Sequence, residues 1–298
     1  MAFRFKHSET VLEGLRRIAR EQIDGAVRTV DADKMSEAQK VHDLRKRCKK
    51  LRGLVRLVRP SLGKDYRAEN AWFRDTARPL SELRDAKVRQ DTYDRLMEHY
   101  ADQISRVEFG PVSRALTLER KALDGGLPID QHLADACARF VEARERVAGW
   151  PLAAGGFKGL RGGLSKTYAR ARVALRKARK SPSPEAFHEA RKRVKYHWHH
   201  CRLLCGAWPT PLKARGRESR RLADLLGQDH DLAVLAEQVG QDPCHYGPET
   251  SVNGFLQLIE RRREELEADA LVLGGRLFAE KPDVFCDRLA AYWRLGRG

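Results

Sequence analysis

The stretch VHDLRKRCKKLRGLVRLVR, residues 41–59, combines the apolar spacing of a helix with a dense positive charge. At about 100° per residue, its apolar side chains fall on one arc, which predicts a helix with one buried face. The residues of this arc are Val41, Leu44, Cys48, Leu51, Val55 and Val58. Arg47 falls among them, and we expect its long side chain to follow the apolar surface and reach solvent.

The cations of the same helix form a second arc beside the apolar one. Its members, within about 80° of His42, are Arg45, Lys49, Arg52 and Arg56, with Lys46 on the flank. Like charges at i and i+4 repel each other, and this stripe carries no acid after Asp43. We interpret the stripe as one wall of a polyanion site. The alternative is a solvated face balanced by carboxylates of neighbouring helices.

A second segment repeats this pattern 146 residues later. FHEARKRVKYHWHHCRLLC, residues 187–205, aligns with 41–59, and HDLAV, 230–234, aligns with RDAKV, 84–88, at the same offset. Two blocks at one offset predict a tandem duplication of a helical unit. We place the boundary in the glycine-rich stretch 149–163, which gives two four-helix-bundle-like halves, residues 1–150 and 151–298.

The second basic helix carries its own stripe and core arc. The stripe consists of His188, Arg191, Lys195, His199 and Arg202, with Lys192 on the flank. Trp198 stands where the first helix has Arg52, so the two stripes differ at that position. The arc expected to face the core contains Val194, Cys201, Leu204 and Cys205.

Helical periodicity also dominates the rest of the chain, which predicts an all-α fold. We expect helices at about 8–30, 36–59, 66–100 with a break near Pro79, 110–124, 130–148, 160–180, 184–206, 211–227, 230–240, 250–272 and 280–295. Ser183 before Pro184 is typical of a helix start, and Ser8 and Thr10 are candidate caps of the first helix. Asp85 and Asp231 are expected to cap helices or, alternatively, to orient a His or Arg of the stripes.

Composition restricts the partners. Lys and Arg outnumber Asp and Glu by 58 to 41, a net charge of +17, which favours a polyanionic partner such as nucleic acid, an anionic membrane surface or a phosphate polymer. No run of about 18 apolar residues and no secretory signal is visible, so we expect no membrane association and a cytoplasmic location. The six scattered cysteines are expected to be reduced thiols.

The motifs favour phosphate binding over other chemistry. The stripes hold one large aromatic residue, Trp198, and no nucleic-acid-binding motif is visible, so nucleic acid is a less favoured partner that stays open. The stripe histidines have cationic neighbours that would repel a metal, and His197, Cys201 and Cys205 are expected to be core residues. No phosphate loop, nucleophile elbow or carboxylate cluster appears. We therefore expect no catalysis, metal or cofactor, and a polyphosphate- or triphosphate-processing enzyme is a second alternative.

The paired motif, H-x-x-R-K-R-x-K followed by (R/H)-D-x-x-V, resembles the CHAD family, the conserved histidine α-helical domain. The resemblance covers nearly the whole chain. It implies two four-helix bundles related by a pseudo-two-fold axis, with a basic groove or pore between them that binds inorganic polyphosphate. It also implies association with polyphosphate granules and their proteins. The chain lacks the ExExK strand of the triphosphatase domain to which some family members are fused, so the resemblance is to a stand-alone binding module.

The resemblance assigns binding roles to the residues of both stripes. The polyphosphate-binding residues that it implies are His42, Arg45, Lys46, Lys49, Arg52, Arg56, His188, Arg191, Lys192, Lys195, His199 and Arg202. Arg172, in the helix before the second motif, is a further candidate, because LSKTYARARVALRKARK, 164–180, also resembles the family.

Overall fold

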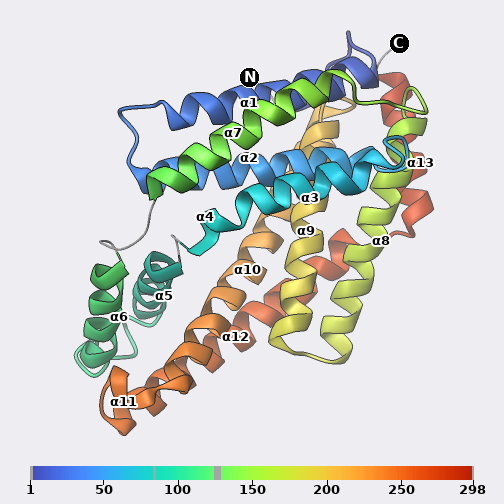
Figure 1. The fold of residues 1–298 in the computed structure, drawn as a ribbon. Helices are drawn as coiled ribbons and strands as arrows, with labels where there is room; N and C mark the ends of the chain where they lie inside the picture. Colours follow the sequence, from blue (N-terminus) through green and yellow to red (C-terminus); the bar gives the residue numbers. More distant parts are fainter. Residues whose placement is uncertain (1–2, 83–84, 124–128, 297–298) are drawn as a thin grey trace.

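The computed structural model describes residues 3–82, 85–123 and 129–296, without the side chains of residues 81, 82, 85, 86 and 123. Within these ranges the chain forms helices joined by loops, and no strand is present (Figure 1). The all-α prediction is confirmed.

The helices form three packed groups (Figure 1). The first contains α1 (Val11–Val30), α2 (Glu37–Leu57), α3 (Asp65–Ala77), the short α4 (Pro79–Glu82) and α7 (Ile129–Ala148). The second contains α8 (Lys158–Lys180), α9 (Pro184–Leu204), α10 (Pro209–Gln241), α12 (Glu249–Leu277) and α13 (Pro282–Leu295). The third, α5 (Asp85–His99), α6 (Gly110–Leu123) and α11 (Pro243–Tyr246), packs beside parts of α10 and α12.

Side-chain caps define where three of these helices begin. Thr10 caps α1 and Ser36 caps α2, each in a capping box with the Glu or Gln three residues later. Ser183 caps α9 by accepting from the Ala186 amide at 3.2 Å, and Pro184 occupies the first turn. The start predicted at Ser183 is confirmed, and Thr10 is the N-cap residue of α1.

Two hydrophobic cores stabilise the molecule. The larger core includes Leu15 of α1, Phe73 of α3, Phe187 of α9 and Phe285 of α13. The smaller core joins α5 and α6 to α10, α11 and α12, and in it the buried Phe255 ring contacts Tyr93 and Phe109. Each core takes residues from both sides of the boundary expected at 150/151, so the two predicted halves share their apolar interiors. The duplication itself stays a prediction.

α2 packs at its C-terminal end against both α8 and α9. A Cβ atom on Gly53 would lie 2.9 Å from the Cβ of His199, and one on Gly163 would lie 1.9 Å from the Leu57 carbonyl oxygen. His200 Nε2 lies 3.1 Å from the Gly53 carbonyl oxygen. Glycine therefore lets the backbones approach at both crossings. The apolar arc predicted for α2 is buried throughout. Arg47, which was expected to extend to solvent, forms an ion pair with Asp43 at 2.5 Å.

α10 differs from the expected pair of helices at 211–227 and 230–240. It is one helix that continues through residues 228–229, and Asp229, which is 1% exposed, accepts from Arg263 of α12 at 3.1 Å. Asp231 therefore lies inside a helix, and its expected capping role is wrong. Its carboxylate lies 3.8 Å from Arg95, which is outside both stripes. Asp85 is the first residue of α5, and its side chain lies outside the described part of the structure.

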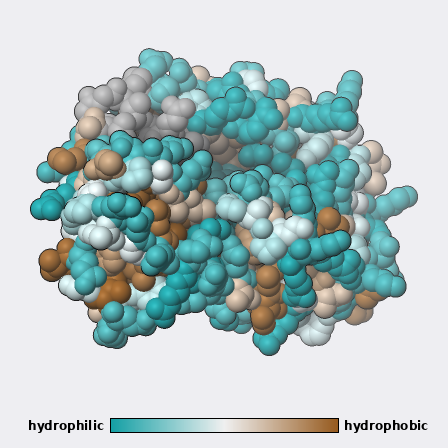
Figure 2. Space-filling model, turned by 90° about the horizontal axis from the view of Figure 1, so that it is seen from below, coloured by the Kyte–Doolittle hydropathy of each residue, from teal (hydrophilic) through white to brown (hydrophobic). Residues whose placement is uncertain are grey.

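The face of the molecule drawn in Figure 2 is mainly hydrophilic, and its hydrophobic residues form separate small patches. Across the described residues, no helix has the length and apolar character needed to cross a membrane.

Candidate functional site

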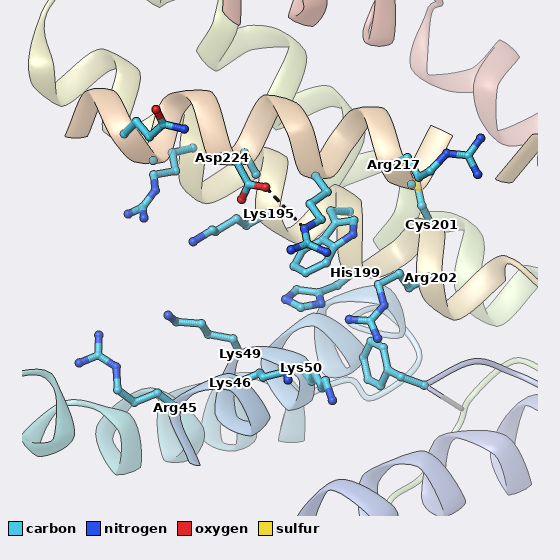
Figure 3. Close-up of a pocket in the computed structure, with 18 of the residues that line it drawn as sticks. Arg45, Lys46, Lys49, Lys50, Lys195, His199, Cys201, Arg202, Arg217 and Asp224 are labelled. Atoms are coloured by element: carbon cyan, nitrogen blue, oxygen red, sulfur yellow. Dashed lines mark ion pairs between the residues drawn. The ribbon is translucent and has the colours of Figure 1, made fainter. Parts of the chain in front are cut away.

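A cavity of about 1320 Å³ lies between α2 on one side and α9 and α10 on the other. Phe3 and Arg4, from the segment before α1, line it together with Val88 and Arg95 of α5. Four regions distant in the sequence therefore meet at one site. Figure 3 shows the open space between α2 and the α9–α10 wall.

Positive charge dominates the lining. Among the described residues, twelve Lys or Arg and two Asp line the cavity. The cations are Arg4, Arg45, Lys46, Lys49, Lys50, Arg95, Arg191, Lys195, Arg202, Lys213, Arg217 and Arg220. Both acids already have a basic partner: Asp224 lies 3.5 Å from Arg220, and Asp231 lies 3.8 Å from Arg95. The lining keeps a large positive excess, which suits an anion with several charges.

The two walls direct cations toward the same space. In Figure 3, Lys49 of α2 and Lys195 of α9 extend from opposite walls into the opening. Arg217 belongs to α10, so three helices contribute long basic side chains. An anion held there contacts charges from both sides, and it offsets their mutual repulsion.

The N-terminal segment closes part of the cavity around Phe3. The ring of Phe3 meets that of His199 edge-on, with centroids 5.9 Å apart. The cationic groups of Arg202 and Lys50 lie 5.2 Å and 5.6 Å from the centre of the Phe3 ring. The Phe5 amide donates to the Leu203 carbonyl at 2.9 Å, which ties this segment to the end of α9.

The acidity of Lys50, a lysine of the cavity, is changed by its surroundings. Burial lowers its pKa to about 8, and the charges of Arg202, Lys46 and Arg47 add to this effect. Its ammonium group donates to Gln22 Oε1 at 3.0 Å. Burial also lowers the pKa of Arg202.

Three histidines near the cavity are held neutral. The rings of His188 and His230 lie 3.9 Å apart between α9 and α10. Burial lowers both pKa values, that of His230 to about 4, and the nearby cations Arg191 and Lys195 act in the same direction. His199 is 5% exposed, and burial holds its pKa well below the usual range. In the free protein these rings accept or donate hydrogen bonds as neutral groups.

The structure brings together most, but not all, of the residues proposed for binding. Those that line the cavity are His42, Arg45, Lys46, Lys49, Arg191, Lys195, His199 and Arg202. Those placed outside its lining are Arg52, Arg56, His188, Lys192 and Arg172.

The crossing at Gly53 explains the position of Arg52 and Arg56. α9 contacts α2 there, and both arginines lie over the ring of Tyr196, at 5.9 Å and 4.1 Å from its centre. Arg56 also donates to the Tyr66 hydroxyl at 3.0 Å and is 8% exposed. The cationic stripe of α2 is thus divided: Arg45 and Lys49 line the cavity, whereas Arg52 and Arg56 lie against Tyr196 outside it.

The other outlying candidates have their own contacts. Arg172 donates to the Phe278 carbonyl at 3.1 Å, in the α12–α13 loop. Lys192 is exposed and pairs with Glu189 at 2.7 Å. His188 lies outside the lining and contacts the ring of His230, which is a lining residue.

Several lining residues were not anticipated from the sequence. Lys213, Arg217 and Arg220 of α10 are spaced i, i+4, i+7, a helical pattern that could have identified them. Lys50 and His230 lie within the repeated motifs themselves. The residues that had no detectable signal are Phe3, Arg4 and Arg95, because only the tertiary fold brings them to the cavity.

His197 and Cys201 are core residues, as expected. His197 is fully buried and accepts a hydrogen bond from Arg215 Nε at 3.2 Å, and Cys201 lies 3.5 Å away. Both Cys201 and Cys205 line the cavity, and Cys205 is only partly buried instead of a core residue. Over the described ranges, no group of three or more His, Cys, Asp or Glu is arranged to hold a metal ion.

Comparison with known families matches residues 13–240 to the CHAD domain. The chain belongs to the CHAD domain family. The match begins in α1 and ends near the C-terminus of α10, so both basic helices of this CHAD domain and its whole cavity wall on α10 lie inside it. The family is associated with polyphosphate or triphosphate binding. A comparison with curated proteins gave no significant match.

Proposed function

We propose that this CHAD domain binds inorganic polyphosphate in the cavity between α2, α9 and α10. The observation that carries the proposal is the lining of twelve Lys or Arg with two Asp, both of which already have basic partners. Phosphate oxygens accept hydrogen bonds from the guanidinium of Arg and are attracted by the positive charge of Lys. A chain of phosphates also spans cations that no single small anion reaches together.

The chemistry of the lining favours a ligand without bases. Nucleic-acid sites for single strands use several aromatic side chains on which bases stack. Here Phe3 and Trp198 are the aromatic residues that line the cavity, and Arg202 lies 5.2 Å from the centre of each ring. Both rings therefore already have a cationic partner. Phosphate groups, which need only donors and charge, fit this surface better.

The proposed role is binding and retention, with polyphosphate granules as the expected location in the cell. Affinity then rises with chain length, because each added phosphate within reach of a cation adds a contact. It also falls as salt rises: an anion neutralised at roughly six to ten positions loses several orders of magnitude in affinity between about 0.05 and 0.2 M salt.

Calorimetric titration tests this assignment. The protein is titrated with long-chain polyphosphate, pyrophosphate and a short duplex DNA, and phosphate release is followed with Mg²⁺ present. We expect tight binding of polyphosphate, weak binding of pyrophosphate and DNA, and no release. Equal binding of DNA would favour a nucleic-acid partner, and metal-dependent release would favour a processing enzyme.

A further inference from the structure

Lys50 has an environment that differs from that of an ordinary surface lysine. It is half-buried and lines the cavity next to the N-terminal segment. Its Nζ atom lies 5.6 Å from the centre of the Phe3 ring. The side chain of Gln22, from α1, accepts its hydrogen bond at 3.0 Å and holds the nitrogen in place. A neutral amine still donates one hydrogen to Gln22 and keeps its lone pair available.

The charges around Lys50 disfavour its protonated form. Lys46 and Arg47 lie on its own helix, and Arg202 faces it from α9; the charge of Asp43 acts in the opposite direction. Together with burial, these cations lower the pKa of Lys50 to about 8. Desolvation and a neighbouring cation are the two means by which proteins activate a lysine amine as a nucleophile.

We propose that Lys50 is a site of acylation by anionic acyl donors, of which acyl phosphates are the simplest class, and that acylation weakens polyanion binding in the same cavity. The cavity gathers the donor through its phosphate group, and Lys50 supplies the attacking amine. The role of the cavity in gathering the donor rests on the proposed anion binding. The reactivity of the amine does not.

The reaction balances without any further reactant. The Lys50 ammonium first loses a proton to water. The lone pair of the amine then forms a bond to the acyl carbon, and the bond from that carbon to the phosphate oxygen breaks. Phosphate leaves with the electron pair, the nitrogen loses its second proton, and a neutral amide remains. One positive charge is removed from the wall that faces the polyanion.

A bound polyanion opposes this reaction. Phosphate charges near Lys50 favour its protonated form and occupy the space that a donor needs. Occupied protein is therefore protected, and free protein is modified. The extent of Lys50 acylation would therefore depend on whether polyphosphate occupied the cavity when acyl phosphate accumulated.

Two donors separate the parts of the proposal. Full-length protein is treated at pH 8 with acetyl phosphate or with an uncharged acetyl ester of N-hydroxysuccinimide, and acetylation is followed by site-resolved mass spectrometry. Lys166 and Lys281, which are exposed and outside the cavity lining, serve as reference lysines. With a pKa near 8, Lys50 holds roughly 100-fold more neutral amine than an ordinary lysine at this pH, and because a less basic amine is a weaker nucleophile we expect roughly tenfold faster acetylation.

The outcomes are distinct. The proposal expects Lys50 to react faster than both references with the uncharged ester, a further gain with acetyl phosphate, and protection by tripolyphosphate. If Lys50 reacted faster than the reference lysines with the ester but not with acetyl phosphate, the cavity would not gather anionic donors. That result would also contradict the proposed function. No preference with either donor would overturn Lys50 as the site, even if calorimetry shows that polyphosphate binds. Lys50→Arg retains the charge, and only the signal at this position should be lost.

Discussion

Residues that are close in the sequence of α2 have different surroundings. Lys49 extends into the cavity, Lys50 lies under Phe3 and against Gln22, and Arg52 lies beside Tyr196 on the other side of the crossing with α9. A stripe of like charges does not reveal this division, because the division depends on where another helix meets α2. The role of a cation on α2 therefore cannot be assigned from its position in the sequence without knowing where α9 crosses the helix.

The buried histidines predict loss of stability in acid. Burial lowers the pKa of His200 to about 3 and holds those of His197 and His199 well below the usual range. Below about pH 6.5 the unfolded chain binds protons that the folded chain does not. The free energy of unfolding should fall with pH in that range, by up to about 1.4 kcal/mol per pH unit for each histidine.

Two buried carboxyl groups act in the opposite sense and must be separated from the histidines. Burial raises the pKa of Asp229 and raises that of Glu267 to about 7, so their protonation in the folded state adds stability as pH falls. Urea unfolding between pH 7.5 and 5 should therefore compare wild type with His200→Leu and with His7→Gln, an exposed histidine. As pH is lowered, the free energy of unfolding should fall less steeply in His200→Leu than in wild type, and as steeply as in wild type in His7→Gln. Equal slopes in all three proteins would contradict the effect ascribed to the buried histidines.

At the scale of helices, close backbone contacts position the walls of the cavity. Gly163→Ala should lower the free energy of unfolding by more than about 2 kcal/mol, because its Cβ would meet the Leu57 carbonyl oxygen at 1.9 Å and force α8 away from α2. The matched change Gly240→Ala, in α10, meets no atom within 4 Å. It should stabilise by about 0.5–1 kcal/mol through helix propensity. Thermal and urea unfolding of both variants measure this difference, and similar losses would contradict the packing described.

Helix existence and the inner face of α2 could be predicted from the sequence because both follow from local rules. Ser183 before Pro184 identified the start of α9, and the period of 3.6 identified Val41, Leu44 and Cys48 as core residues. The continuity of α10 was not predicted: the sequence suggested a break at residues 228–229, where the structure has Asp229 buried and paired with Arg263 of α12.

At the scale of the whole molecule, the cavity is a product of tertiary structure. The repeated motif drew attention to α2 and α9, which contact each other and both line the cavity. The cations Lys213, Arg217 and Arg220 of α10 and the N-terminal segment were missed, because they lie outside the repeated blocks and only the tertiary fold brings them to the site. The positive excess of the chain is likewise not spread evenly: it converges on one space between helices.

The most direct test of the account is to remove two charges from inside the cavity or two from outside it. Lys49→Gln/Lys195→Gln and Lys166→Gln/Lys192→Gln change the net charge equally, but Lys49 and Lys195 line the cavity and Lys166 and Lys192 do not. The dissociation constant for long-chain polyphosphate should rise at least roughly tenfold in the first variant, because hydrogen bonds to charged groups contribute about 1.5–3 kcal/mol each, and by less than about twofold in the second. Equal losses in both variants would mean that the surface charge as a whole binds the polymer, and would contradict the cavity as its site.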